Sequence, residues 1–378
     1  MLTVERTVDE VLAAKMARRG VVHHEVVDPA ELGTRLEAFL ASKLSGAFTV
    51  RDLARLAGGA SKEQFSFTLD WDDGGGARTD RMVLRKNPPA SVVETHRLRE
   101  FQLLAALAGV VPVPPVHWIT TDPEPFGEPA LICGFVPGVT APTKSTGRKA
   151  SGLGTAYGDL APRLGAQFVE HLGRLHAFDW RAADLSAFDV PEAGTTQALD
   201  WRLAHWDRVW AEDAAEPHPA VTLARQWLWD RRPAVDRVSV VHGDYRNGNF
   251  LFDEDRAEIT AILDWELGYL GDRHHDLAYL MLVGWGHDDG RGRYLCSGLL
   301  DAESIVARYE QASGLAVDPA RLEYYTVLNM YWATVACSGT APRIADDGMT
   351  HLDVMMPFVS GLGAFFIGEL TKVLTEKG

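Results

Sequence analysis

The feature that most constrains the fold is a pair of short apolar segments, each of which runs into a polar loop. Val240-Val241 precedes the loop HGDYRNGN at 242–249, and Ile259–Leu263 precedes a second polar turn, DWE, at 264–266. Short apolar runs bounded by polar turns are typical of buried strands. A polar loop held between buried strands needs hydrogen-bonding partners or a function. We therefore predict that the two loops contribute to one site.

The residue types in these loops fit phosphoryl transfer assisted by a divalent cation. Asp244 and Asn249 lie five residues apart, which is the spacing between the base and the metal-binding amide in kinase catalytic loops. Asp264 ends the next strand, so its carboxylate can reach the same ion. Mg²⁺ takes few protein ligands beside waters and phosphate oxygens. We predict Asp244 as the catalytic base, and Asn249 and Asp264 as the metal ligands.

The longer pattern HGDYRNGNFLFD, followed by ITAILDWELGYLGD and HDLAYL, resembles the aminoglycoside phosphotransferase and choline kinase-like family. It is most similar to the branch related to kinase-like domains fused to acyl-CoA dehydrogenases. At the level of motifs the resemblance covers residues 48–280. It implies a protein-kinase-like fold and an enzyme that uses ATP and Mg²⁺ to phosphorylate a hydroxyl group of a small molecule. It also implies structural roles for His242 and for Asp276, which would brace the catalytic loop.

The same resemblance assigns the nucleotide side of the site. The third predicted strand ends in two basic residues, Arg85 and Lys86, and one of them would bind the α- and β-phosphates of ATP. Neighbouring residues of a strand point to opposite faces, so only one can enter the cleft. Arg85 is the favoured candidate and Lys86 the alternative, with Glu100 of the next helix as the expected ion-pair partner. A GGAS turn that contains Gly59 and Ser61 resembles the phosphate-covering loop and lacks its full glycine pattern.

The resemblance places the adenine site where an apolar strand runs into a Pro-Gly break. Backbone groups of Gly134, Phe135 and Val136 would bond the base, with Cys133 packed beside them as a buried thiol. A buried strand that simply ends at a turn has the same pattern, and the two interpretations are compatible.

The rest of the chain divides into a half with strands and a half with helices. The predicted strands lie at 48–57, 63–71, 81–86, 115–120 and 129–136, and the main predicted helices at 4–19, 29–43, 91–108, 199–231, 301–313, 319–337 and 351–375. We expect an α+β, bilobal fold, with a small N-terminal antiparallel sheet plus one helix and a larger, mostly helical C-terminal lobe. The expected divisions are an N-terminal lobe at 1–136, a linker at 137–159 and a C-terminal lobe at 160–378.

Composition limits the partners and the compartment. A net charge of −15 makes the chain a poor candidate for binding nucleic acid or an anionic membrane. Three widely separated cysteines without CxxC spacing indicate a reducing compartment and no zinc site. The N-terminus has no apolar leader, and no stretch reaches the roughly 18 apolar residues of a membrane span. We expect a cytoplasmic protein with no membrane segment and no obligate protein partner.

The phosphate acceptor is the part of the function that the residues determine least. Five tryptophans could line an aromatic pocket, although a place in the core is the favoured interpretation (Trp201, Trp206, Trp210, Trp227 and Trp229). Asp346, Asp347 and Asp353 could meet a cationic antibiotic, although an exposed acidic loop is favoured. An antibiotic, a hydroxyacyl thioester and another metabolite all stay open as acceptors. Two other functions also stay open, namely a nucleotide-binding pseudokinase that acts as a sensor or scaffold, and a metal-dependent hydrolase.

Overall fold

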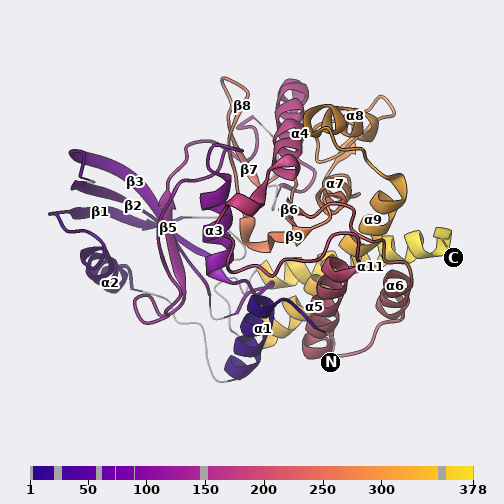
Figure 1. Ribbon diagram of the computed structural model, residues 1–378, viewed down its shortest axis with the longest axis horizontal. Coiled ribbons are helices and arrows are strands. Elements are labelled where there is room, and N and C mark those ends of the chain that lie inside the picture. The colour runs from indigo at the N-terminus through magenta and orange to yellow at the C-terminus, as the bar shows by residue number, and fades with distance from the viewer. Residues whose placement is uncertain are drawn as a thin grey trace.

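The computed structural model describes residues 3–20, 28–56, 62–72, 74–88, 90–144, 152–347 and 355–377. In this part of the chain a small antiparallel sheet lies on one side of the molecule and a larger group of helices on the other (Figure 1). Helix α3 (Arg97–Leu107) lies between the two portions. The predicted α+β fold with a small sheet and a helical portion is confirmed.

The sheet has the strand order β1-β2-β3-β5-β4 in the described residues, and every neighbouring pair is antiparallel. Its strands are β1 (Thr49–Arg55), β2 (Glu63–Asp72), β3 (Ala77–Lys86), β4 (Val116–Thr120) and β5 (Ala130–Gly134). Strands β2 and β3 form a long hairpin in which Glu63 pairs with Lys86. This long hairpin extends β3 four residues before the predicted start at Arg81, because the exposed residues 77–80 complete the pairing without adding to the core.

Alternation along β3 decides which side chains face the cleft. Met82 and Leu84 pack with helix α2 (Pro29–Ala41) in one apolar cluster, whereas Val83 packs with β5 and with Phe101 of α3 in another. Because side chains alternate across a strand, Arg85 shares the face of Val83. The sheet therefore presents Arg85 to the helical portion of the molecule.

The helical portion carries three short antiparallel strand pairs in the described residues from 152 onward. Strand β6 (Ser239–Val241) pairs with β9 (Tyr269–Gly271), and β7 (Phe250–Asp253) pairs with β8 (Glu258–Ile262). The third pair is β10 (His287–Asp288) with β11 (Tyr294–Leu295). The α-helices are α1 (Arg6–Arg18), α4 (Ala161–Ala177), α5 (Gln197–Asp213), α6 (Pro219–Asp230), α7 (His274–Leu280), α8 (Ala302–Ser313), α9 (Pro319–Thr334), α10 (Ala341–Asp347) and α11 (Met355–Lys377).

Two helix boundaries differ from the prediction for identifiable reasons. The helix predicted from residue 91 begins at Arg97, since Ser91 and Glu94 are bonded to each other in an irregular segment that follows two prolines. The helix predicted to end at 337 is α-helical to Thr334 and continues as a π-helical turn over Val335–Thr340. Turns of this kind often occur where a helix borders a functional site.

One described helix, Met356–Glu376, is long and apolar enough to cross a membrane by length and composition, and 17% of the scored stretch is buried. Glu369 and Lys372 interrupt its apolar run, so the sequence predicted no membrane span there. Core helices of soluble proteins reach the same length and composition.

Candidate active site

A cavity of about 640 Å³ lies between the sheet and the helical portion. Its walls come from β3 and β5 on one side and from the loops after β6 and β8 on the other. They include most of the predicted site residues, namely Arg85, Cys133, Gly134, Phe135, Val136, Asp244, Asn249 and Asp264. Segments more than 150 residues apart in sequence therefore meet in one cleft.

The predicted base and the predicted metal-binding amide are in direct contact. Asn249 Nδ2 donates to Asp244 Oδ2 at 2.5 Å and to the Asp244 carbonyl at 2.9 Å. This geometry directs the amide nitrogen of Asn249 toward Asp244 and leaves Oδ1 as the amide atom that would bind a cation. Gly243 has a φ of 83°, and a Cβ there would come within 2.6 Å of the Leu267 carbonyl. The turn before Asp244 therefore requires glycine.

Asp276 fixes the start of this loop by accepting hydrogen bonds from its backbone. Its carboxylate accepts from the backbone N–H groups of His242 at 2.7 Å and Gly243 at 2.8 Å, and it contacts His176 Nε2 at 3.1 Å. Burial alone would raise the pKa of Asp276. The hydrogen bond with His176 and the nearby imidazoles together lower it by more, so the pKa lies below its ordinary value. His242 Nε2 contacts the Leu263 carbonyl at 2.8 Å and ties the loop to the strand that leads to Asp264. The structural contacts expected of His242 and Asp276 are observed.

Asp264 lies at the end of β8 in a left-handed conformation, with φ 60° and ψ 53°. Such a conformation is uncommon for a residue other than glycine and often marks a functional site. Asp264 Oδ1 contacts Arg85 Nη2 at 2.9 Å. Burial raises the pKa of Asp264, Arg85 opposes the rise, and the carboxylates of Glu266 and Asp244 add to it. A divalent cation would relieve this crowding of negative charge.

The donor set fits Mg²⁺ only when a nucleotide is also bound. No group of three His, Cys, Asp or Glu side chains with metal-binding geometry occurs among the described residues. Asp264 and the amide oxygen of Asn249 are hard oxygen donors, which suit Mg²⁺, and the phosphates would supply further oxygens. The arrangement therefore fits an ion that arrives with ATP.

Arg85 enters the cleft and Lys86 does not. Arg85 forms a buried ion pair with Glu100, which also pairs with Arg97. Burial opposes the charged form of Arg85, yet the Glu100 and Asp264 carboxylates raise its pKa above the ordinary value. Lys86 points to the other face of β3, where its Nζ lies 2.9 Å from Glu63. Of the two candidates for the phosphate-binding cation, this placement favours Arg85 and corrects the inclusion of Lys86.

In the predicted adenine segment, fewer backbone groups than expected are free to hydrogen-bond a base. Gly134 N–H donates to the Pro115 carbonyl at 2.7 Å, and Phe135 N–H donates to the Arg81 carbonyl at 2.9 Å. A base would therefore have to bond the Val136 backbone or carbonyl groups of the segment. Burial raises the pKa of the Cys133 thiol to about 11, which fits a packed thiol and not a nucleophile. Gly59 and Ser61 lie outside the described residues.

The far end of the cavity is aromatic and apolar, and sequence reasoning missed the residues that form it. They come from α7 and the segment after it, from α9 with its π-helical turn and from α11: Tyr279, Trp285, Trp332, Ala333, Ala336, Leu362 and Phe366. The five tryptophans singled out in the sequence do not line the cavity, and Trp206 is buried in the core against Trp332. Asp346 and Asp347 lie on α10, and Asp346 does not line the cavity either; Asp353 is outside the described residues.

Arg246, two residues after Asp244, also lines the cavity at this end. Its Nε lies 3.0 Å from Asp244 Oδ1, and its guanidinium carbon lies 4.4 Å from the ring centroid of Trp285. The pair places a cation directly beside the predicted base. Its neighbour Asn247 donates to the Gly152 and Trp285 carbonyls.

The sheet, the two polar loops and the cation on β3 define a kinase-like small-molecule phosphotransferase. The sequence model of the phosphotransferase enzyme family matches residues 52–325, and the chain belongs to this family.

Relatives and solved structures agree with this assignment. Acyl-CoA dehydrogenase family member 10 of Mus musculus is 31% identical over 212 residues, which cover 54% of this chain and 18% of that protein. The chain thus spans only a minor part of the length of the curated relatives it matches.

Two solved structures share the fold. A candidate aminoglycoside phosphotransferase from Ralstonia eutropha aligns with a TM-score of 0.64 and 22% identity, covering 91% of this chain and 98% of that one. A mutant of aminoglycoside phosphotransferase APH(4)-Ia, in a ternary complex with AMP-PNP and hygromycin B, aligns with a TM-score of 0.51 and 19% identity, covering 91% and 99%. At these identities the similarity concerns the fold.

Proposed function

We propose that the protein is an ATP- and Mg²⁺-dependent phosphotransferase that phosphorylates a hydroxyl group of a small molecule. The observation that carries the proposal is the meeting of Asp244, Asn249 and Asp264 in one cleft, opposite the Arg85–Glu100 ion pair. Phosphoryl transfer needs little covalent help from the protein. It needs positioning and charge stabilisation, which this set of groups can supply.

Each group has a role in the proposed reaction. Asp244 orients the acceptor hydroxyl and accepts its proton. Asn249 Oδ1 and the Asp264 carboxylate would hold Mg²⁺, which neutralises charge on the β- and γ-phosphates when it is bound. Arg85, positioned by Glu100, donates to the α- and β-phosphates, a role for which its planar guanidinium is suited. Arg85 contacts Asp264 in this structure. Binding of nucleotide and metal would therefore have to break this ion pair or leave both side chains able to contact the ligand as well.

Nucleotide use is supported by the fold and by the cleft's composition. The related APH(4)-Ia structure contains AMP-PNP, a nonhydrolysable ATP analogue, and aligns over most of this chain. The cleft also has an apolar wall, formed in part by Val83, Leu251 and Leu263, against which a purine could pack.

The acceptor end favours a substrate with an apolar body that is neutral or anionic. Its described lining is aromatic and apolar apart from Arg246, Asp244 and the neighbouring metal-site groups. A polycationic amino sugar would need carboxylates of its own there, and it would be repelled by Arg246. The proposed acceptor is therefore not an aminoglycoside of the kind seen with the structural relatives.

The test is ADP release with a panel of hydroxyl compounds that spans amino sugars, choline, hydroxy acids and apolar alcohols. We expect Mg²⁺-dependent ADP release with an apolar member, and its loss in Asp244→Ala, which still binds MgATP. Asp236→Asn, a change of an exposed carboxylate outside the cleft, serves as the control. ATP binding without ADP release would support the pseudokinase alternative. Mg²⁺-dependent hydrolysis without ATP would support the hydrolase.

We also propose that the protein works in a reducing compartment such as the cytoplasm. All three cysteines are free and buried, and none is placed to form a disulfide with another.

A further inference from the structure

Helix α1 precedes the part of the chain that the family model matches, and it contacts both portions of the molecule. It ends at Arg18, whereas the family match begins at residue 52. In Figure 1 the helix lies beside α5, below α3, at the junction between the sheet and the helical portion. A helix in this position can influence how the two portions sit around the cleft.

On its helical-portion side, α1 is fixed by buried polar contacts. Lys15 Nζ lies 3.1 Å from Asp213 Oδ1 and 2.7 Å from Glu212 Oε2, both at the end of α5. Thr7 Oγ1 donates to the Ala187 carbonyl at 2.9 Å. The side chains of Lys15 and Asp213 are 4% and 1% exposed, so this end of the helix is held firmly.

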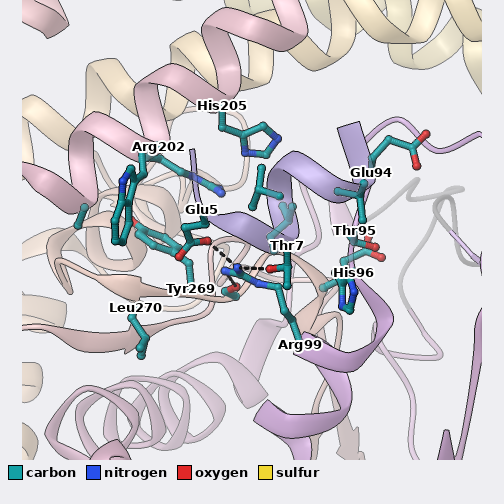
Figure 2. Close-up of a pocket in the computed structure, with 17 residues that line it drawn as sticks. Glu5, Thr7, Glu94, Thr95, His96, Arg99, Arg202, His205, Tyr269 and Leu270 are labelled. Carbon is teal, nitrogen blue, oxygen red and sulfur yellow. Dashed lines mark hydrogen bonds and ion pairs between the residues drawn. The ribbon is translucent and has the colours of Figure 1, made fainter. Parts of the chain in front are cut away.

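On the other side, α1 holds Arg99 of α3. Arg99 Nη1 lies 2.6 Å from Glu5 Oε2 and 3.1 Å from Thr7 Oγ1, as the dashed lines in Figure 2 show. Arg99 Nη2 reaches the Gly268 carbonyl at 3.3 Å. Gly268 follows Asp264 by four residues, so one guanidinium joins α1, α3 and the segment that follows the predicted metal ligand.

The residue after Arg99 is Glu100, the partner of Arg85. A shift of α3 would therefore move Glu100 and change the placement of Arg85 in the cleft. The packing is close, since a Cβ at Gly268 would lie 2.2 Å from Leu103 of α3. Small movements of the helix are thus transmitted to the segment after Asp264 and not absorbed by space between them.

The interface beneath α1 is polar, which suits a contact that can open. A cavity of about 40 Å³ lies there, lined by Glu5, Arg99, Arg202 and His205 among others (Figure 2). Arg202 is buried, and its Nε and Nη2 have no hydrogen-bond partner in the described structure, as is also true of His205 Nε2. Such a cavity has room for water, so separating this interface exposes less apolar surface to water than separating an apolar core would.

We propose that α1, with Glu5 and Thr7, is a brace that sets the position of α3 and thereby tunes nucleotide binding at the cleft. Glu5, Thr7 and Arg99 are positioning residues, since they act through Glu100 and Arg85. The proposal rests on the proposed function in one respect, because it takes the cleft to bind MgATP. It adds a control element that lies outside the part of the chain matched by the family.

The test compares Glu5→Gln and Thr7→Val with Asp9→Asn in the full chain. Asp9 lies on the same helix and is 64% exposed, and its ion pair is with Arg208 of α5 and not with α3, so it is the matched control. We expect the dissociation constant of Mg²⁺·AMP-PNP, measured by calorimetry, to rise about threefold to thirtyfold in the two brace variants, a range usual for mutations that modulate coupling between sites. Hydrogen exchange of the α3 amides should rise in parallel, and the control should change neither quantity.

Two results would overturn the brace. The first is a lower melting temperature in Glu5→Gln with unchanged nucleotide affinity and unchanged exchange in α3, which is the behaviour of a purely structural helix. The second is an equal effect in Asp9→Asn. A wild-type protein that binds no nucleotide would overturn the proposed function. In that case hydrogen exchange in α3 tests the brace by itself: a rise in Glu5→Gln and not in the control would support the brace, and no rise would contradict it.

Discussion

Replacing Asp276 with Asn tests the claim that a single buried carboxylate shapes the catalytic loop. Asp276 is fully buried and accepts from the N–H groups of both His242 and Gly243. Asn can keep one of these bonds through its Oδ1, but its amide nitrogen would face the other donor. An unsatisfied buried N–H costs about 1–3 kcal/mol, and a lost hydrogen bond to a charged group about 1.5–3 kcal/mol. We therefore expect Asp276→Asn to lower the free energy of unfolding by about 3–5 kcal/mol, as for other broken buried ion pairs.

Urea unfolding followed by tryptophan fluorescence measures this change. Glu31→Gln is the control, because Glu31 pairs with Arg35 of the same helix and their side chains are 58% and 43% exposed. An exposed pair contributes less than about 1 kcal/mol. Turnover of Asp276→Asn should fall more than its affinity for Mg²⁺·AMP-PNP, since the loop carries Asp244. An unfolding free energy within about 1 kcal/mol of the wild type would refute the reasoning, because the loop would then be held by other contacts.

Three further outcomes follow from the same structure. Gly243→Ala should lower turnover sharply with the chain still folded by circular dichroism, since a Cβ there meets the Leu267 carbonyl at 2.6 Å. Glu100→Gln should weaken Mg²⁺·AMP-PNP binding in calorimetry, because Arg85 loses its buried partner; unchanged affinity would contradict its role. Burial lowers the pKa of His275 to about 3, so the unfolded chain takes up the proton first as the pH falls below about 6.5. The free energy of unfolding should then fall by about 1.4 kcal/mol for each pH unit between about 6.5 and about 3. Urea unfolding measured from pH 7 to pH 5 tests this slope, which should be smaller in His275→Gln.

The groups that the sequence predicted well are those whose placement is local. Asp244 and Asn249 lie on one loop with a fixed spacing, and Asp264 ends the neighbouring strand, so their approach follows from chain connectivity. Strand alternation likewise separates Arg85 from Lys86, although only the packing of β3 shows which face is the cleft.

The groups that the sequence missed depend on contacts between distant segments. Trp285, Trp332 and Phe366 meet at the acceptor end from three separate segments, and no periodicity relates them. The contact between Glu5 and Arg99 joins residues 94 positions apart, and nothing in either local pattern indicates it. Arg246, in contrast, follows the predicted base by two residues, so its place beside Asp244 follows from the local sequence.

The most direct test of the account is the metal dependence of nucleotide binding. Calorimetry of AMP-PNP with and without Mg²⁺ should show binding that requires the ion. Asn249→Ala and Asp264→Asn should each weaken AMP-PNP binding in the presence of Mg²⁺ about tenfold or more, because replacing even a residue that only orients a metal ligand lowers metal affinity by that factor. Asp244→Ala should bind AMP-PNP with the affinity of the wild type. Equal affinity with and without Mg²⁺, and in all three variants, would contradict the claim that these side chains form one site for phosphoryl transfer.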